Sequence, residues 1–214
     1  MGFELTCADY IEWIGRAHAK IAKNADYITE LDAATGDGDH WTNINMGFEK
    51  LVEMSDELAA LSIGAALKRI GMTMMSVVGG SGGVLYGSAY MEAAKAVEQA
   101  QTLTSQDVCN MLEAMLGAIM SRGKAQPGDK TMIDTLHPAV QCYKNCLEQG
   151  EDEAQTLALV KQAALDGAQA TKDMEAARGR AYYQAGKGVG HLDPGAVTMS
   201  YQIETLMDYI GEKL

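Results

Sequence analysis

The sequence predicts an all-α protein. Apolar residues recur at the three- and four-residue spacing of amphipathic helices along most of the chain. Strand signals are scarce, because β-branched runs are few and no Asn-Gly hairpin separates alternating segments. The chain also has 14 Met and only 2 Phe, which fits a helical core packed by adaptable side chains.

Four helices are expected in the first half of the chain. Thr6 with Asp9 has the spacing of a capping box and predicts the start of the first helix. The fourth helix, residues 84–100, is rich in alanine, the residue that most favours helix. The first three helices carry their apolar residues at Tyr10, Ile14, Ala17 and Ile21; at Ile44, Phe48, Leu51 and Val52; and at Ile63, Leu67, Ile70 and Met74.

Four more helices are expected in the second half. Thr104 with Asp107 predicts the cap of the fifth helix, whose apolar residues are Val108, Met111, Leu112 and Met115. The sixth helix covers residues 131–147, and Pro138 is expected to break or kink it. The seventh covers residues 153–174, and the eighth is the C-terminal stretch 196–214.

Length and charge limit the organisation and the partners. A chain of 214 residues with 47% apolar and 21% charged residues can form one compact domain, residues 1–214. Its formal net charge of −12 argues against nucleic acid and anionic membranes as partners and suits a protein that collects cations. The four cysteines form no CxxC pair and no long apolar run is present, so we expect a reduced, cytoplasmic setting.

Four glycine-rich loops interrupt the helical pattern, and three of them contain aspartate. In an antiparallel bundle alternate loops gather at one end, so these four could form one site. The loops are expected at residues 35–40, 79–83, 123–130 and 186–195.

Three of these loops can be interpreted either as ligand-binding sites or as ordinary turns and connectors. Asp32, Asp37 and Asp39 can surround a hard cation such as magnesium, or they can cap the next helix in a solvated turn. The run Gly79–Gly83 can cradle a phosphate at a helix start, or act as a flexible connector. Arg180 can hold phosphate charge, while Asp193-Pro194-Gly195 can equally be a turn.

Taken together, these motifs resemble the DhaL family in order and spacing. The resemblance runs from about Thr6 to the C-terminus and implies a closed antiparallel bundle (barrel) of eight helices. That bundle would hold ADP, or ATP, and two magnesium ions at one end. The matching stretches are Asp32…Gly36-Asp37-Gly38-Asp39-His40…Asn43, Gly79-Gly80-Ser81-Gly82, Pro127-Gly128-Asp129-Lys130-Thr131-Met132 and Gly190-His191-Leu192-Asp193-Pro194-Gly195-Ala196.

The resemblance also implies a role for each site residue. Asp32, Asp37 and Asp39 would bind the metal ions, and His40 and Arg180 would be catalytic. A diphosphate beside three carboxylates is tolerable only with divalent cations between them, which agrees with this assignment. The residues implied to bind nucleotide are His40, Asn43, Ser81, Gly82, Gly123, Thr131, Met132, Arg180, Asp193, Pro194 and Gly195, with Met132 near the base.

The implied activity is phosphoryl transfer by positioning and electrostatics. A phosphohistidine (M-type) protein would recharge the bound ADP, and the acceptor would be a hydroxyketone held on a separate K-type subunit. Two alternatives stay open: a nucleotide-loaded regulatory module without its own chemistry, and a kinase subunit for another triose, tetrose or acyl substrate. Trp41 and Gly82, which stand where the family usually has glycine and serine, keep the second alternative open. A homodimer is also left open.

Overall fold

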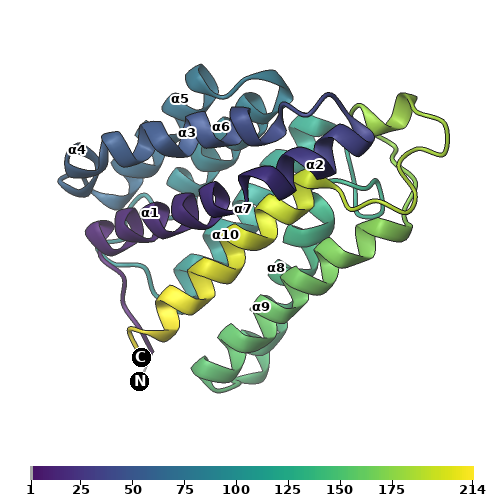
Figure 1. Cartoon of the computed structure of the whole chain (residues 1–214). Coiled ribbons are helices and arrows are strands. Elements are labelled where there is room, and N and C mark those ends of the chain that lie inside the picture. Colours follow the sequence, from purple (N-terminus) through teal and green to yellow (C-terminus); the bar gives the residue numbers. More distant parts are fainter. Residues whose placement is uncertain (1) are drawn as a thin grey trace.

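The computed structural model describes residues 2–214, and within them α-helix is the dominant structure (Figure 1). No β-strand is formed in this range; the single β-bridge joins Leu5 to Leu103. The all-α prediction is therefore confirmed. The α-helices are α1 (Cys7–Lys23), α2 (Ala25–Thr35), α3 (His40–Glu53), α4 (Ser55–Ala59), α5 (Ile63–Val77), α6 (Gly80–Ala96), α7 (Ser105–Gly123), α8 (Ile133–Gln149), α9 (Glu153–Ala170) and α10 (Pro194–Gly211). Two short 3-10 helices, η1 (Thr171–Asp173) and η2 (Ala181–Tyr183), lie between α9 and α10.

The long helices pack side by side in an order that follows the chain. Helix α1 packs against α3, α3 against α5, and each later helix against the next, up to α9 and α10. Helix α10 also packs against α1, which is compatible with the predicted closed bundle. The largest fully buried side chains include four tyrosines, Tyr86, Tyr90, Tyr143 and Tyr209, together with Phe48.

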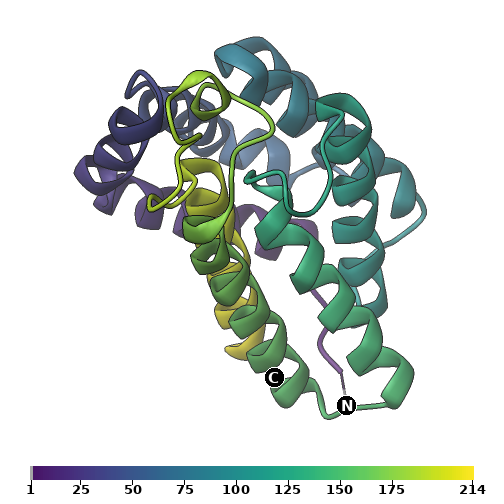
Figure 2. The same ribbon diagram turned by 90° about the vertical axis from the view of Figure 1, so that its right-hand side faces the viewer.

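Because the direction of the chain reverses at each connection, the bundle has two distinct ends (Figures 1 and 2). The loop end comprises residues 36–39, 78–79, 124–132 and 171–193. The opposite end comprises residues 54–62, 97–104 and 150–152, and the C-terminus and the first described residues lie there. The four loops that the sequence singled out are thus gathered at one end of the molecule.

Two helices were not expected from the sequence. Helix α2 follows α1 after a short break at Asn24, and α4 follows α3 at Met54. Helix α2 has a polar sequence with only three buried residues, so its apolar periodicity is weak. The eight expected helices correspond to the remaining α-helices.

The predictions for the bounds of α6, for an interruption of α8 and for the end of α9 were wrong. The glycine run is not a loop, because α6 begins at Gly80 rather than at Val84, and α6 ends at Ala96. A Cβ at Gly83 would collide with the carbonyl oxygen of Val78, so glycine lets α6 start directly against the end of α5. Helix α8 runs through Pro138 without a break, and α9 ends at Ala170, followed by η1.

Within residues 2–214, no helix combines the length and the apolar character that crossing a bilayer requires.

Candidate functional site

Three carboxylates meet where α2 ends. Asp32 lies in the last turns of α2, and Asp37 and Asp39 lie in the loop that leads to α3. One ligand oxygen from each carboxylate lies within 4.8 Å of the others. Asp32 is buried, whereas Asp37 and Asp39 are exposed. The C-terminal carbonyls of α2 add negative potential, so the cluster suits a hard divalent cation that stays accessible from solvent.

A glycine allows this loop to fold back on the helix. The N–H of Gly36 donates to the carbonyl oxygen of Asp32 at 2.5 Å. A Cβ on Gly36 would lie only 2.5 Å from Oδ1 of Asp32, so a larger residue would push on the carboxylate itself. Gly38 has φ +76°, in the left-handed region. The spacing of acidic residues and glycines therefore follows from the shape of the loop.

Arg180 lies against the carboxylate cluster. Its Nη2 is 2.6 Å from Oδ2 of Asp37, and both side chains remain largely exposed. Arg180 comes from the long connection between α9 and α10, some 140 residues from Asp37 in the chain. The structure thus brings the predicted catalytic arginine to the predicted metal ligands.

His40 connects three helices at the same point. It is the first residue of α3, and its backbone N–H donates to Oδ2 of Asp32 at 2.9 Å. Its Nε2 lies 2.9 Å from the hydroxyl of Thr198 on α10. Burial lowers the pKa of His40 from its usual value, although the charges of Asp32 and Asp39 partly oppose this.

The glycine-rich start of α6 presents free amides beside Asn43. A Cβ on Gly79 would collide with Oδ1 of Asn43, so the two residues are in close contact. Gly79 occupies the N-cap position and has no side chain to bond the first-turn N–H groups. Ser81 is exposed and Gly82 is half-buried in this first turn. Uncapped amides at a helix start favour an anion such as phosphate.

The loop before α8 is organised by two residues that sequence reasoning did not select. The buried carboxylate of Asp134 accepts from the N–H of Gly128 at 2.5 Å and from the N–H of Thr131 at 2.8 Å. Thr131 and Asp134 have the spacing of a capping box, a signal that could have identified Asp134. Lys130, the other residue, is 2% exposed, and no local pattern marks a lysine that will be buried.

The start of α10 completes this end of the bundle. Asp193 caps the helix by accepting from the N–H of Ala196 at 2.7 Å, and Pro194 occupies the first turn. Gly195 faces Met132, since a Cβ there would lie 3.9 Å from the Cβ of Met132. Burial and the nearby carboxylates Asp134 and Asp32 raise the pKa of Asp193 to about 7, against the lowering effects of the Ala196 amide and Lys130.

The remaining predicted residues share the loop end but face other neighbours. Gly82 lies against Val78, and Gly123, the last residue of α7, lies against Leu85. Trp41 packs against the hydrophobic core, with its Nε1 buried and unpartnered. Its half-buried indole therefore packs partly into the interior.

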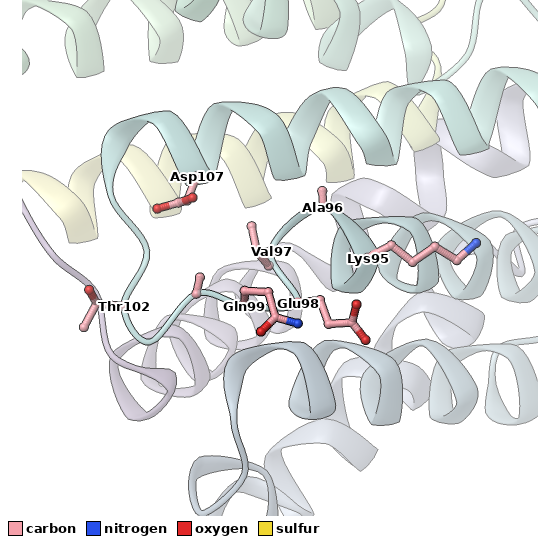
Figure 3. A pocket seen from close by; sticks show the side chains of 8 residues that line it. Lys95, Ala96, Val97, Glu98, Gln99, Thr102 and Asp107 are labelled. Carbon is pink, nitrogen blue, oxygen red and sulfur yellow. The ribbon is translucent and has the colours of Figure 1, made fainter.

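A hollow of about 410 Å³ lies at the opposite end of the bundle, between the end of α6 and the start of α7 (Figure 3). Its polar side chains, among them Lys95, Thr102 and Asp107, point in different directions rather than toward one another. The candidate site is thus the loop end, where polar groups from four connections converge.

Comparison with known proteins identifies relatives that cover nearly the whole chain. The model of the DAK2 domain family matches residues 34–208. The ADP-binding subunit DhaL of the PEP-dependent dihydroxyacetone kinase of Escherichia coli is 37% identical over 202 residues, which cover 94% of this chain and 96% of that protein. The ADP-binding subunit DhaL of the PTS-dependent dihydroxyacetone kinase of Lactococcus lactis is 35% identical, over 97% of this chain and all of that protein.

A solved structure has the same fold. The dihydroxyacetone kinase from C. freundii in complex with AMP-PNP and Mg²⁺ superposes with a TM-score of 0.71 at 25% identity. The match covers 94% of this chain but only 33% of that longer kinase chain. From the family match and these relatives, the chain belongs to the DAK2 domain family, to which the DhaL subunits belong.

Proposed function

We propose that this chain is the ADP-binding subunit of a dihydroxyacetone-type kinase, with all 214 residues acting as one nucleotide-binding domain. The observation that carries the proposal is the meeting of Asp32, Asp37 and Asp39 with Arg180 at one end of the bundle. The DhaL relatives, which match this chain over their whole length, support it. The same relatives support a cytoplasmic setting.

The three carboxylates would hold two magnesium ions, with Asp32 as the buried ligand and Asp37 and Asp39 as the exposed ones. When bound, these ions supply the positive charge that lets a diphosphate lie beside three carboxylates. Asp32 also accepts the His40 amide, so the first turn of α3 keeps one ligand oriented.

The nucleotide would lie across the helix starts of the loop end. The first turn of α6, with Ser81 and Gly82, and the adjoining Asn43 offer donors for its phosphates. Met132 and Gly195, which face each other, offer an apolar edge for the base. Gly123, Thr131, Asp193 and Pro194 would line the remainder.

For transfer, the chain's own residues would position and neutralise the moving group. Arg180 can swing between Asp37 and a phosphoryl oxygen, because its side chain is largely exposed. The contact of His40 with Thr198 would hold the imidazole in place beside the phosphates. The chain would act with a K-type subunit that holds the hydroxyketone and an M-type phosphohistidine protein that recharges ADP.

The first test is mass spectrometry and metal analysis of the gently purified protein. Wild type is expected to carry ADP and two magnesium ions, and Asp37→Ala to lose both. Asp56→Ala, an exposed aspartate on α4 at the opposite end, removes the same charge and should keep both. Absence of bound ADP, and of any ADP- and magnesium-dependent rise in melting temperature, would contradict the proposal.

A second measurement separates an enzyme subunit from a regulatory module. Phosphoryl transfer to dihydroxyacetone is assayed with a K-type partner, supplied with either a phosphohistidine protein or free ATP. Turnover with the phosphohistidine protein is expected. Tight ADP binding without turnover from either donor would leave nucleotide binding intact and favour a regulatory role.

A further inference from the structure

The segment 172–191, which carries Arg180, has few attachments of its own to the bundle. In the described part of the chain, the N–H of Met174 donates to the carbonyl of the adjoining Thr171 at 3.3 Å, and three further polar contacts join the segment to residues beyond its ends. The N–H of Ala177 donates to the carbonyl of Asp129 at 3.1 Å, Arg180 pairs with Asp37, and Lys130 bonds to its end at His191. Four of its glycines and Lys187 have positive φ, and most of its side chains are exposed. Such a segment opens easily unless something fastens its ends.

Lys130 fastens both ends at once. Its Nζ donates to the carbonyl oxygen of Thr171 at 2.5 Å, just before the segment, and to the carbonyl oxygen of His191 at 2.6 Å, at its end. The residue is 2% exposed and has φ +60°, an uncommon conformation for a residue with a side chain. Gly188 lies against its stem, since a Cβ there would be 3.1 Å from Cε of Lys130.

The environment of the ammonium group favours this contact. Burial lowers the pKa of Lys130, while the nearby carboxylates Asp193, Asp134 and Asp173 oppose the shift. A charged donor bonded to two carbonyl oxygens in a buried site makes stronger hydrogen bonds than an exposed pair. The Arg180–Asp37 pair, by contrast, is largely exposed, so it contributes little to holding the segment.

We propose that Lys130 is a positioning residue that fastens the segment 172–191 and so places Arg180 at the carboxylate cluster. Lys130 would not touch the nucleotide or the acceptor. It acts through Arg180, and in that respect the inference rests on the proposed function. Its structural part, the fastening of the segment, can be measured in the protein without any ligand.

The structural part is tested by limited digestion with trypsin in the absence of nucleotide and metal. The segment offers cleavage sites after Lys172, Arg178, Arg180 and Lys187. In Lys130→Met, cleavage there is expected to rise at least roughly tenfold, because cleavage follows the fraction of open segment, while cooperative melting is retained. Lys161→Met is the matched control, since it removes a lysine that pairs with Asp208 at 2.7 Å, away from the segment. It should be cleaved like wild type.

Chemical rescue distinguishes the ammonium group from bulk packing. Lys130→Ala removes the stem and the charge, and n-propylammonium replaces both in solution. Added n-propylammonium is expected to slow cleavage of the segment in Lys130→Ala. An uncharged apolar compound of similar size should not slow it. It should leave wild type and Lys161→Met unchanged.

The functional part is tested by a double-mutant cycle with Arg180→Gln in the assembled kinase. If Lys130 acts through Arg180, Lys130→Met lowers kcat when Arg180 is present and has little further effect in Arg180→Gln. A general structural role would lower kcat by the same factor in both backgrounds.

Three results would overturn the inference: wild-type cleavage rates in Lys130→Met, loss of cooperative melting in that variant, or equal kcat factors in the cycle. Failure of wild type to bind ADP would overturn the proposed function alone, because the cleavage and rescue measurements need no nucleotide.

Discussion

The two ends of the bundle differ in how the N-termini of their helices are capped. At each end four long helices begin, and the first N–H groups of each helix need partners. At the opposite end all four helices, α1, α5, α7 and α9, are capped by their own N-cap side chains: Thr6, Ser62, Thr104 and Asp152. At the loop end, of the four helices α3, α6, α8 and α10, only α10 is capped in this way, by Asp193.

The two ends also differ in backbone conformation, because residues with positive φ lie mostly at the loop end. Of the eight glycines with positive φ, seven lie at the loop end and only Gly150 lies at the opposite end. The three other residues with positive φ, Lys124, Lys130 and Lys187, are also at the loop end. Strained loops, uncapped amides and clustered carboxylates reduce stability unless a ligand compensates. The opposite end therefore maintains the fold, whereas the loop end is arranged to bind a ligand.

The largest expected effect is the stabilisation of the loop end by its ligand. With ADP and magnesium about a thousandfold above Kd, the free energy of unfolding should rise by about 4 kcal/mol. Asp39→Ala should abolish most of this rise, yet barely change the unliganded protein, because the Asp39 side chain makes no cap bond. Thermal melts with and without ligand give both values. Asp152→Ala, at the opposite end, should keep the full ligand-dependent rise. If both variants lost this rise equally, the two ends would not differ in ligand binding.

The next effect concerns glycine at the loop end. Gly83→Ala should lower the free energy of unfolding by about 3 kcal/mol, because its methyl group meets the backbone carbonyl of Val78. Gly117→Ala is the matched exchange, since nothing lies within 4 Å of a Cβ there on the exposed side of α7. It should raise stability by about 0.5 to 1 kcal/mol. Urea denaturation of both variants measures this contrast, which would disappear if both changes had the same sign.

The pH dependence of the free energy of unfolding should show the cost of ionising a buried carboxyl group at the loop end. The pKa of Asp193 is raised to about 7 in the folded protein, above its ordinary value of 3.8, so ionisation of this group destabilises the fold. The penalty is absent below pH 3.8, grows between pH 4 and 7, and is complete above pH 7. Asp193→Asn, which can still cap α10, should therefore raise stability at pH 8 by roughly 2 kcal/mol after allowance for solvent screening. It should give no gain at pH 4.

This experiment is done in the presence of a metal chelator, and Asp152→Asn serves as control. Asp152 caps α9 at the opposite end, so its exchange should not produce a gain that grows with pH. A gain for Asp193→Asn that is the same at pH 4 and pH 8 would contradict the assignment.

The smallest expected effect lies at the opposite end. Thr104→Ala removes the capping box of α7 and should cost about 1 kcal/mol of stability. Because Thr104 lies at the end away from the aspartates, the affinity for ADP should stay unchanged. Calorimetric titration beside urea denaturation measures both quantities, and a weakened ADP affinity would show that the two ends are coupled.

Much of the fold could be predicted from local sequence. The capping boxes at Thr6 and Thr104 and the apolar periodicities are local patterns, and the structure confirms both caps. Helix α2 was missed because its apolar periodicity is weak, and Pro138 was expected to interrupt α8. The helix passes through Pro138 where Gly167 of α9 packs closely against it, a contact that the local sequence does not contain.

The candidate site could be predicted in part. The acidic loop was found because three aspartates with intervening glycines form a local pattern, and Asp134 had a capping-box spacing that could have been used. Lys130 could not be found, because its two partners, the carbonyls of Thr171 and His191, are 41 and 61 residues away in sequence.

The helical class, the capped starts of α1 and α7 and the chemistry of each loop follow from the sequence alone, since these depend on residues a few positions apart. The contacts of Arg180 with Asp37 and of His40 with Thr198, and the burial of Lys130 beside the segment 172–191, follow only from the tertiary structure. These contacts depend on helix packing, which brings together residues far apart in the chain. The reversal of direction at each connection places them at one end.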